Sequence, residues 1–202
     1  VRTRKYTQPN HSTEFDAATH VAIRQNYTAM VENIDRWLGV FLDEIRKRGE
    51  FDNTLVVYSS DHGDMLGDLN RWAKSVPYQP SIGVPLALAG PGVERGIRSE
   101  ALVSHIDLAA TFLTAAGVKV PRTMDSRPLQ PVLSGKARTH REYVRSGLNE
   151  WRAVWDGRYK LVRGFGKEKQ FLLFDVPAEN NDIAAQRPEI VERLTKLLPE
   201  IR

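Results

Sequence analysis

The residues of this sequence that are best suited to chemistry form a short series after an apolar run. Asp61 and His62 stand side by side, Gly63 follows them, and Lys74 lies thirteen positions after Asp61. A carboxylate next to an imidazole suits a divalent cation of hard to borderline character, and a glycine lets the backbone turn sharply or approach a ligand closely. Ligands of open α/β sheets bind outside the carboxyl ends of strands. The series therefore predicts a metal corner at the end of a strand.

The polar residues around this series have simpler structural interpretations. We expect Asp64 and Asp68 to order the loop or to be exposed carboxylates, and His105 and Asp107 to cap the helix that follows them. His140 lies in a polar stretch, where an exposed side chain is expected. For the aspartate–histidine pair itself, the alternative to metal binding is a capped turn with a hydrogen-bonded histidine.

A long amphipathic helix precedes the aspartate–histidine pair. Thr13, with Asp16 three residues later, can begin a helix, and Gly49 after three basic residues can end it. The apolar positions between them follow a spacing of three and four residues, which predicts one buried stripe: Tyr27, Val31, Ile34, Leu38, Phe41 and Ile45. An apolar strand at 54–60 comes next, and a helix followed by a strand is the repeating half of a parallel sheet.

Short elements are predicted after Lys74. Residues 84–89 form an apolar run that predicts a second sheet strand, and residues 97–103 predict a short edge strand. A buried helix is expected at 108–113, followed by a loop at 118–140 that is rich in Pro, Gly and Arg. We therefore assign residues 1–140 to one α/β domain.

The pattern changes near residue 141. Four short β-prone runs predict a small antiparallel sheet: Tyr143–Leu148, Arg152–Trp155, Tyr159–Arg163 and Phe171–Phe174. Asp156-Gly157 is a strong hairpin turn, and the alternation of Trp151 with polar residues is typical of sheet packing. Pro188 opens a last helix. We assign residues 141–202 to a subdomain made of this sheet and helix.

Composition bounds the class of protein. The 202 residues are 41% hydrophobic and 27% charged, which is ordinary for a soluble globular protein. The net charge of +4 favours anionic ligands but is too small to indicate nucleic-acid binding, and no apolar stretch is long enough to span a membrane. The absence of cysteine slightly favours the cytoplasm over the periplasm. A basic start without Met or a following apolar segment predicts a piece of a longer chain or a processed product, and no signal peptide.

Taken in order, these motifs resemble the carboxy-terminal half of a sulfatase, within the alkaline-phosphatase-like hydrolase superfamily. The resemblance covers the chain from about Tyr27 and rests on Asn53–Asp68, Trp72, Lys74, Val84-Pro85-Leu86, Gly90-Pro91-Gly92 and Val103–Leu108. It implies an α/β fold that is part of an alkaline-phosphatase-like sandwich, followed by a small C-terminal four-stranded antiparallel sheet and a closing helix.

The resemblance also implies roles for three residues. In sulfatase-like enzymes the aspartate and the residue after it bind the divalent metal of the active site, commonly calcium. Asp61 and His62 are thus implied metal ligands, for Ca²⁺ first and for Mg²⁺ or Mn²⁺ as alternatives. The lysine after the Asp-His-Gly loop contacts the sulfate oxygens, which gives Lys74 a catalytic and substrate-binding role. The implied substrate is a small anionic ester, whose transition state a metal and cations stabilise.

The sequence departs from the family pattern in several ways. Leu69 stands where members often have histidine, and Gly83 where they often have arginine. The formylglycine nucleophile of the family is made in a Cys/Ser-x-Pro-x-Arg motif, which is absent here, as is the Asp-Asp pair that completes the metal site. In the family both lie upstream, so the implied partner is the N-terminal half of the same fold. Alone, the chain is expected to be inactive and to associate with further copies of itself through uncovered apolar faces.

Three alternatives stay open at this point. Close variants with the same half-site cleave phosphodiesters or phosphonate monoesters. A non-catalytic sulfatase-like module would keep the fold without the chemistry. A basic nucleic-acid binder rests on charge alone.

Overall fold

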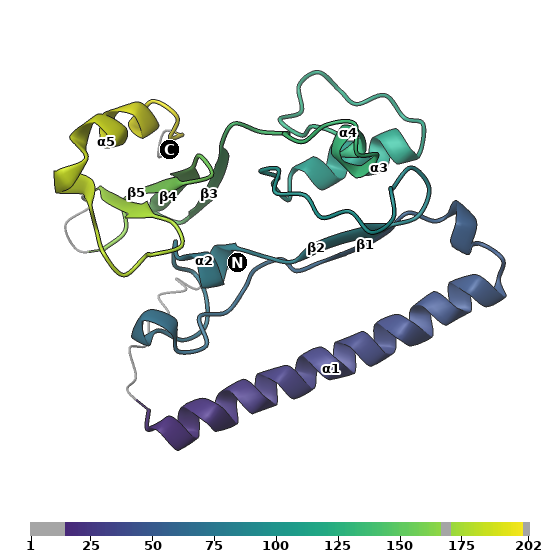
Figure 1. The fold of residues 1–202 in the computed structure, drawn as a ribbon, viewed down its shortest axis with the longest axis horizontal. Helices are drawn as coiled ribbons and strands as arrows, with labels where there is room; N and C mark the ends of the chain where they lie inside the picture. Colours follow the sequence, from purple (N-terminus) through teal and green to yellow (C-terminus); the bar gives the residue numbers. More distant parts are fainter. Residues whose placement is uncertain (1–14, 167–170, 200–202) are drawn as a thin grey trace, which may run out of the picture.

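The computed structural model describes residues 15–166 and 171–199. Its helices and strands are α1 (Ala17–Lys47), β1 (Val56–Ser59), α2 (Gln79–Ile82), β2 (Leu86–Ala89), α3 (Asp107–Ala115), α4 (Gln130–Leu133), β3 (Val144–Leu148), β4 (Trp151–Trp155), β5 (Tyr159–Arg163), β6 (Leu172–Asp175) and α5 (Pro188–Thr195). The β1–β2 pair lies between α1 and the helices α3 and α4, and the sheet of β3 to β6 lies at one end with α5 (Figure 1). Within these residues, no helix is long and apolar enough to cross a membrane.

The expected long helix is present as α1. Asp16 caps its start, because one carboxylate oxygen accepts a hydrogen bond of 2.7 Å from the backbone N–H of Thr19. Thr13, the other expected start residue, lies outside the described residues. Gly49 follows the helix with a φ of +69°, the left-handed conformation that ends many helices.

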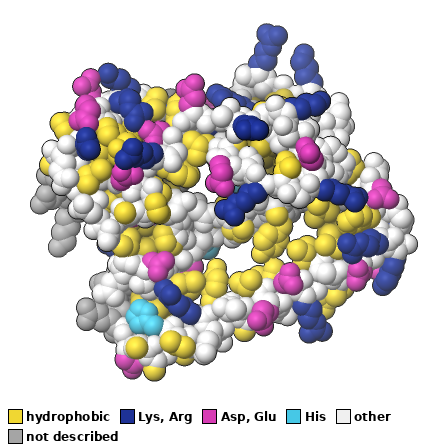
Figure 2. All heavy atoms as spheres, in the orientation of Figure 1, with side chains coloured by type: hydrophobic (Ala, Val, Ile, Leu, Met, Phe, Trp, Pro, Cys, Tyr) yellow, Lys and Arg dark blue, Asp and Glu magenta, His cyan; other side chains and the backbone are white. Residues whose placement is uncertain are grey.

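α1 does not bury the apolar stripe that its sequence predicts. All of α1 is described, and Ile45 is its one buried residue. Ile34 and Phe41 are 52% and 57% exposed. Hydrophobic side chains line the inner side of this helix, and open space separates its middle from the body of the molecule (Figure 2). The prediction of burial is wrong for this chain because a spacing pattern marks a face for burial but does not supply the surface that covers it.

The described contacts of α1 gather at its two ends. Near its start, the Arg24 guanidinium lies 2.9 Å from the Asp68 carboxylate, and the rings of His20 and Trp72 have centroids 4.9 Å apart. At its other end, the Arg46 guanidinium lies 4.5 Å from the ring centroid of Phe51.

β1 and β2 form an antiparallel pair, with Val56 opposite Ala89 and Ser59 opposite Leu86. The parallel sheet predicted from the helix–strand order is therefore not seen in the described chain. The reason is that β2 begins beside the end of β1, after a connection that returns the chain to the same edge, and an apolar run carries no information on direction. The strand expected at 97–103 is also wrong: this stretch pairs with no described strand, and Ile97 is 44% exposed.

The second expected helix is α3, which ends before Gly117 at a φ of +70°. The expected loop at 118–140 contains the short helix α4, in which Val132 is buried. Ser126 anchors this segment to α3, since its hydroxyl accepts a hydrogen bond of 2.8 Å from the backbone N–H of Ala110.

The C-terminal sheet agrees with its prediction. Its strand order is β3-β4-β5-β6, with every neighbouring pair antiparallel. One face buries the cluster of Trp151, Ala153, Val162 and Phe174, which confirms sheet packing for Trp151. The other face buries Val154, Leu161, Leu173 and Leu194, the last of which comes from α5. The boundary expected between residues 140 and 141 lies in the segment from α4 to β3 and stays a prediction.

Candidate functional site

β1 carries the chain directly into the predicted metal corner. The Ser60 hydroxyl donates a hydrogen bond of 2.7 Å to the carbonyl of His62, and the Gly63 N–H donates one of 2.9 Å to the carbonyl of Ser81. A Cβ at position 63 would lie 2.0 Å from the carbonyl oxygen of Pro80. Glycine is therefore required here, because the site loop must approach the neighbouring backbone closely.

The three residues singled out from the sequence lie together. His62 Nδ1 lies 2.8 Å from the carbonyl oxygen of Gly63. A carbonyl only accepts, so Nδ1 carries the proton and Nε2 presents a lone pair. Lys74 Nζ donates a hydrogen bond to that Nε2, and Asp61 Oδ1 lies 3.6 Å from it. A carboxylate, an imidazole lone pair and an ammonium group thus converge at one point.

The loop between His62 and Lys74 is held by local contacts. Asp64 accepts a hydrogen bond of 2.9 Å from the N–H of Leu66, and Asp68 forms the ion pair with Arg24, which confirms that both order the loop. Met65 is fully buried beneath it.

These residues line a cleft of about 660 Å³. One wall comes from the site loop, a second from residues 103–105, and a third from β3 and β4 of the C-terminal sheet. The cleft walls include His105, whose role as a helix cap is not seen. The Ser59 hydroxyl donates to the carbonyl of Pro85 at 2.8 Å, so its oxygen accepts from His105 Nε2, also at 2.8 Å. Sequence reasoning missed this histidine because only the fold brings it beside the end of β1.

The donor set fits part of a metal site. The Asp61 side chain is 86% exposed and the His62 side chain 38%, so both are accessible from the cleft. Oxygen and imidazole nitrogen are suitable donors for divalent cations. Within residues 15–166 and 171–199, however, no group of three or more His, Asp or Glu side chains could hold an ion. The described residues thus offer two candidate ligands at this point, fewer than a complete site for a divalent cation needs.

The two departures from the family pattern lie in different surroundings. Leu69 has a φ of 53° inside the turn at Asp68–Asn70 and is not part of the cleft wall. Gly83 does line the cleft, and a Cβ there would lie 2.6 Å from Nε2 of Gln79. A larger residue at position 83 would have to displace the Gln79 side chain.

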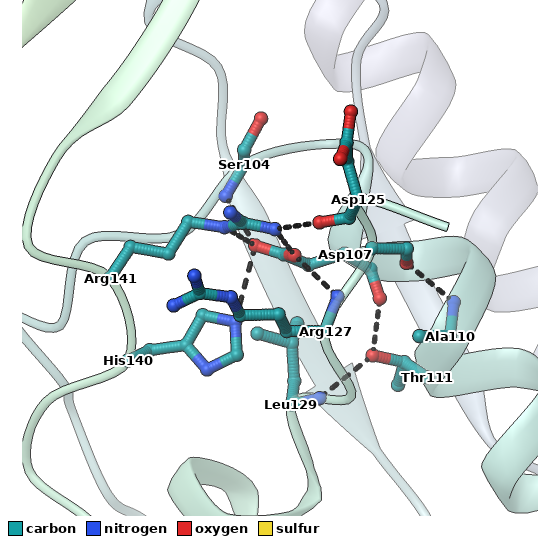
Figure 3. A network of polar contacts seen from close by, with 10 residues as sticks. Ser104, Asp107, Ala110, Thr111, Asp125, Arg127, Leu129, His140 and Arg141 are labelled. Atoms are coloured by element: carbon teal, nitrogen blue, oxygen red, sulfur yellow. Dashed lines mark hydrogen bonds and ion pairs between the residues drawn. The ribbon is translucent and has the colours of Figure 1, made fainter. Parts of the chain in front are cut away.

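A second polar cluster lies at the start of α3 (Figure 3). The Asp107 carboxylate is fully buried and accepts from Nε of Arg141 at 2.8 Å, from the Ser104 N–H at 3.0 Å and from the Arg127 N–H at 3.0 Å. Its predicted capping role is not seen, because Asp107 is itself the first residue of α3 and its carboxylate accepts from groups outside that helix. Burial raises the pKa of Asp107, but the hydrogen bonds from Arg141, Arg127 and Ser104 outweigh burial and hold that pKa below its ordinary value.

His140 belongs to the same cluster, so its predicted exposure is wrong. Its side chain is 7% exposed, and Nε2 lies 3.2 Å from Asp107 Oδ2. The polar residues around it in the sequence are no guide, because the segment from α4 to β3 folds back over the start of α3. No local signal marks its burial, because the carboxylate that it contacts lies 33 positions away in the sequence.

Comparison with known families matches almost the whole chain. The family model described as Sulfatase matches residues 2–118. The model described as the C-terminal region of N-sulphoglucosamine sulphohydrolase matches residues 67–202.

Individual relatives and structures agree with the family models. Arylsulfatase K of Xenopus laevis is 30% identical over an alignment of 197 positions, which covers 89% of this chain and 37% of that protein. The structure of BT4656 in complex with its substrate D-glucosamine-2-N,6-O-disulfate has a TM-score of 0.77 at 28% identity, over 85% of this chain and 38% of that one. Phosphonate monoester hydrolase SpPMH of Silicibacter pomeroyi has a TM-score of 0.74 at 28% identity, over 81% and 37%. The chain thus spans 37–38% of the length of these three proteins.

Proposed function

Because this chain belongs to the sulfatase family, we propose that it carries one part of the active site of a metal-dependent hydrolase of sulfuric esters. The observation that carries the proposal is the convergence of Asp61, His62 and Lys74 at the end of β1, in one accessible cleft. Each side chain offers a group that sulfuryl transfer requires: two metal ligands and one cation for the anion.

Asp61 and His62 would hold the divalent cation, as the metal dependence general to sulfatases suggests. Ca²⁺ is the first candidate, with Mg²⁺ and Mn²⁺ as alternatives. A cation held there supplies positive charge for the oxygens of the ester group. The contact of His62 Nδ1 with the Gly63 carbonyl fixes the tautomer that leaves Nε2 free for such a ligand bond.

Lys74 would bind the anionic part of the substrate. Its ammonium group uses the His62 lone pair, so it must leave Nε2 before that lone pair can serve a metal. Lys74 is exposed and lines the cleft, and its flexible stem lets the ammonium group reach a substrate oxygen instead.

The remaining groups would come from sequence outside these 202 residues. The chain contains no cysteine and no Ser-x-Pro-x-Arg motif, so a formylglycine nucleophile and further metal ligands belong to the N-terminal half of the same fold. The exposed apolar face of α1 fits this partner, because a helix face that is apolar and uncovered requires a covering surface. Compartment and oligomeric state stay predictions.

The test uses the complete protein, meaning this chain with the sequence encoded upstream of residue 1. We expect hydrolysis of an aryl sulfate, and a loss of about 100-fold or more in kcat/KM for Asp61→Asn and His62→Ala. Metal content per molecule, measured by elemental analysis, should fall in both variants. Lys74→Ala should reduce kcat/KM and leave the metal content unchanged.

Asp43→Asn is the matched control, because Asp43 is an exposed carboxylate on α1 that pairs only with Arg46 among the described contacts. It should behave as wild type. If the complete protein hydrolyses no ester, or if Asp61→Asn changes neither metal content nor rate, the chain is a non-catalytic member of the family.

The similarity to phosphonate monoester hydrolase SpPMH supports a second candidate, hydrolysis of phosphonate monoesters or phosphodiesters. The same two ligands and lysine suit a phosphoryl oxygen, since both esters develop charge on non-bridging oxygens. The ratio of kcat/KM for an aryl sulfate and an aryl phosphonate monoester distinguishes the two reactions.

A further inference from the structure

A buried ion pair connects the C-terminal sheet to the loop that carries Lys74. Lys160, on β5, is 1% exposed, and its ammonium group contacts Glu179. The same Nζ donates a hydrogen bond of 2.6 Å to the carbonyl of Pro77. Glu179 uses its second oxygen to accept from the backbone N–H of Gln79, at 2.5 Å. Lys160 and Glu179 therefore hold two backbone groups of one loop, at positions 77 and 79.

Two further contacts hold this loop on the sheet. The indole Nε1 of Trp151 donates a hydrogen bond of 3.1 Å to the carbonyl of Ser75. The ring of Tyr78 packs against Phe174, with centroids 5.8 Å apart. Together with the ion pair, these contacts fix the main chain at alternate positions from 75 to 79.

The backbone at Lys74 is one that needs such support. Its neighbours Ala73 and Ser75 have φ values of 61° and 79°, in the left-handed region that residues with a side chain rarely adopt. Conformations of this kind cost free energy and persist only where the surroundings impose them. The side chain of Lys74 is itself long and exposed, so its reach into the cleft is set by the placement of its backbone.

We propose that Lys160 and Glu179 are positioning residues for Lys74, placing the anion-binding lysine through the main chain at Pro77 and Gln79. The proposal deepens the proposed function and rests on it, because it assumes that Lys74 binds the substrate anion. It assigns a task to the C-terminal sheet, which otherwise contributes only a wall of the cleft.

The chemistry of the pair favours positioning over stability alone. Burial lowers the pKa of Lys160, and the hydrogen bond and charge of Glu179 oppose that shift. Removing charges from water has a desolvation penalty, so an apolar pair of similar size is often as stable as a buried ion pair. An apolar pair, however, cannot donate to the Pro77 carbonyl or accept from the Gln79 N–H.

The decisive variant is therefore the double substitution Lys160→Met with Glu179→Leu in the complete protein. We expect its melting temperature to stay within a few degrees of wild type, while kcat/KM for an aryl sulfate falls about 10- to 100-fold, as displacement of a catalytic group by about 1 Å can cause. Hydrogen–deuterium exchange should show faster exchange at the Gln79 amide. Arg158→Met with Asp175→Leu is the matched control, since this ion pair, between the residue before β5 and the last residue of β6, is exposed, and it should change neither kcat/KM nor exchange at Gln79.

Each other outcome has a defined meaning. Wild-type kcat/KM in the double variant, with wild-type exchange at Gln79, overturns the proposal. If the double variant unfolds, Glu179→Gln decides, because it keeps the size of the side chain and an acceptor for Gln79 but removes the charge that holds the Lys160 ammonium group, and it should still lower kcat/KM. If wild type hydrolyses no ester, the proposed function fails, and exchange at Gln79 still reports whether the pair orders the loop.

Discussion

The C-terminal sheet and the helix α1 are both rich in apolar residues, yet only the apolar side chains of the sheet are buried. Leu161, Val162 and Leu173 are fully buried between the sheet faces, α5 and the preceding loops. On α1, Trp37 and Phe41 are 58% and 57% exposed. The sheet has the packing of a self-contained core, whereas α1 has the face of a helix whose covering surface is not among the described residues.

Asp107 and Asp61 differ in burial in the same way as the sheet and α1. Asp107 is fully buried, and its partners Arg141, Arg127 and Ser104 supply its hydrogen bonds (Figure 3). Asp61 is 86% exposed at the mouth of the cleft. A carboxylate whose oxygens are all used within the chain is structural, while an exposed one beside an imidazole lone pair is available to a ligand. The region around Asp107 therefore supports the fold, and the region around Asp61 carries the proposed chemistry.

The largest predicted effect on stability tests this comparison between the buried sheet and the exposed face of α1. Leu161→Ala should reduce the free energy of unfolding by about 3–5 kcal/mol, because it leaves a cavity in a fully buried cluster. Phe41→Ala should cost less than about 0.5 kcal/mol in the 202-residue chain, where the ring is exposed. Urea denaturation followed by circular dichroism measures both values.

The complete protein should reverse the result for Phe41. If an upstream half covers α1, Phe41→Ala should cost about 3 kcal/mol or more there, close to the cost at Leu161. An equally small cost in both proteins would mean that α1 stays uncovered, and would remove the argument for a covering half.

The next effect concerns Asp107. Asp107→Asn should reduce the free energy of unfolding at neutral pH by about 2–3 kcal/mol, since it leaves the Arg141 guanidinium without its charged partner. The folded pKa of Asp107 lies below its unfolded value of about 4. The stabilisation is therefore fully present above about pH 4 and is lost as the pH falls through the folded pKa.

Denaturant titrations at a series of pH values measure this difference. The gap between wild type and Asp107→Asn should be constant from about pH 5 to pH 7 and should narrow below about pH 4. A gap that widens as the pH falls would contradict the assignment of Asp107 as an ionised, hydrogen-bonded group.

Local patterns predicted much of this structure, because their signals are complete within a few residues. The hairpin at Asp156-Gly157 depends on its own turn chemistry, and Gly63 follows its strand as a close-approach glycine should. The Asp61–His62 pair could be found in the same way, although its role as a metal site stays a prediction.

The errors share one physical cause, which is that they depend on contacts distant in the sequence. The direction of β2 depends on where its connection returns, the exposure of α1 on a covering surface, and the burial of His140 on a carboxylate 33 positions away in the sequence. No local pattern contains that information. The hydrogen bonds from Lys160 and Glu179 to the loop that carries Lys74 could not be predicted from the sequence for the same reason.

A smaller effect is expected at Asp156, which joins the hairpin to the last helix. Its carboxylate accepts from the N–H groups of Arg158 and Tyr159 at 3.0 and 2.7 Å, and from the Arg193 side chain at 2.6 Å. Asp156→Asn should cost about 1 kcal/mol of unfolding free energy, since the turn keeps an acceptor but loses the charge facing Arg193. Thermal denaturation measures it, with Asp52→Asn as an exposed control. No difference between the two variants would mean that the contacts to α5 contribute little to the sheet.

The smallest effect on stability is expected at Arg24. Its substitution compares the local opening of α1 with that of the C-terminal sheet. Arg24 Nη2 pairs with Asp68, and Nε donates to the carbonyl of Leu66 at 3.0 Å. The ion pair is about half exposed, so Arg24→Ala should cost only about 0.5 kcal/mol. Among the described residues, however, this contact is one of few that hold the start of α1, so its removal in the 202-residue chain should speed hydrogen exchange in the first turns of α1 and leave exchange in β4 and β5 unchanged. Arg36→Ala, further along the same helix, is the control and should leave exchange near Arg24 as in wild type. Equal exchange in wild type and Arg24→Ala would show that the contacts of Arg24 do not hold the start of α1, and would leave the ring contact of His20 with Trp72 to do so.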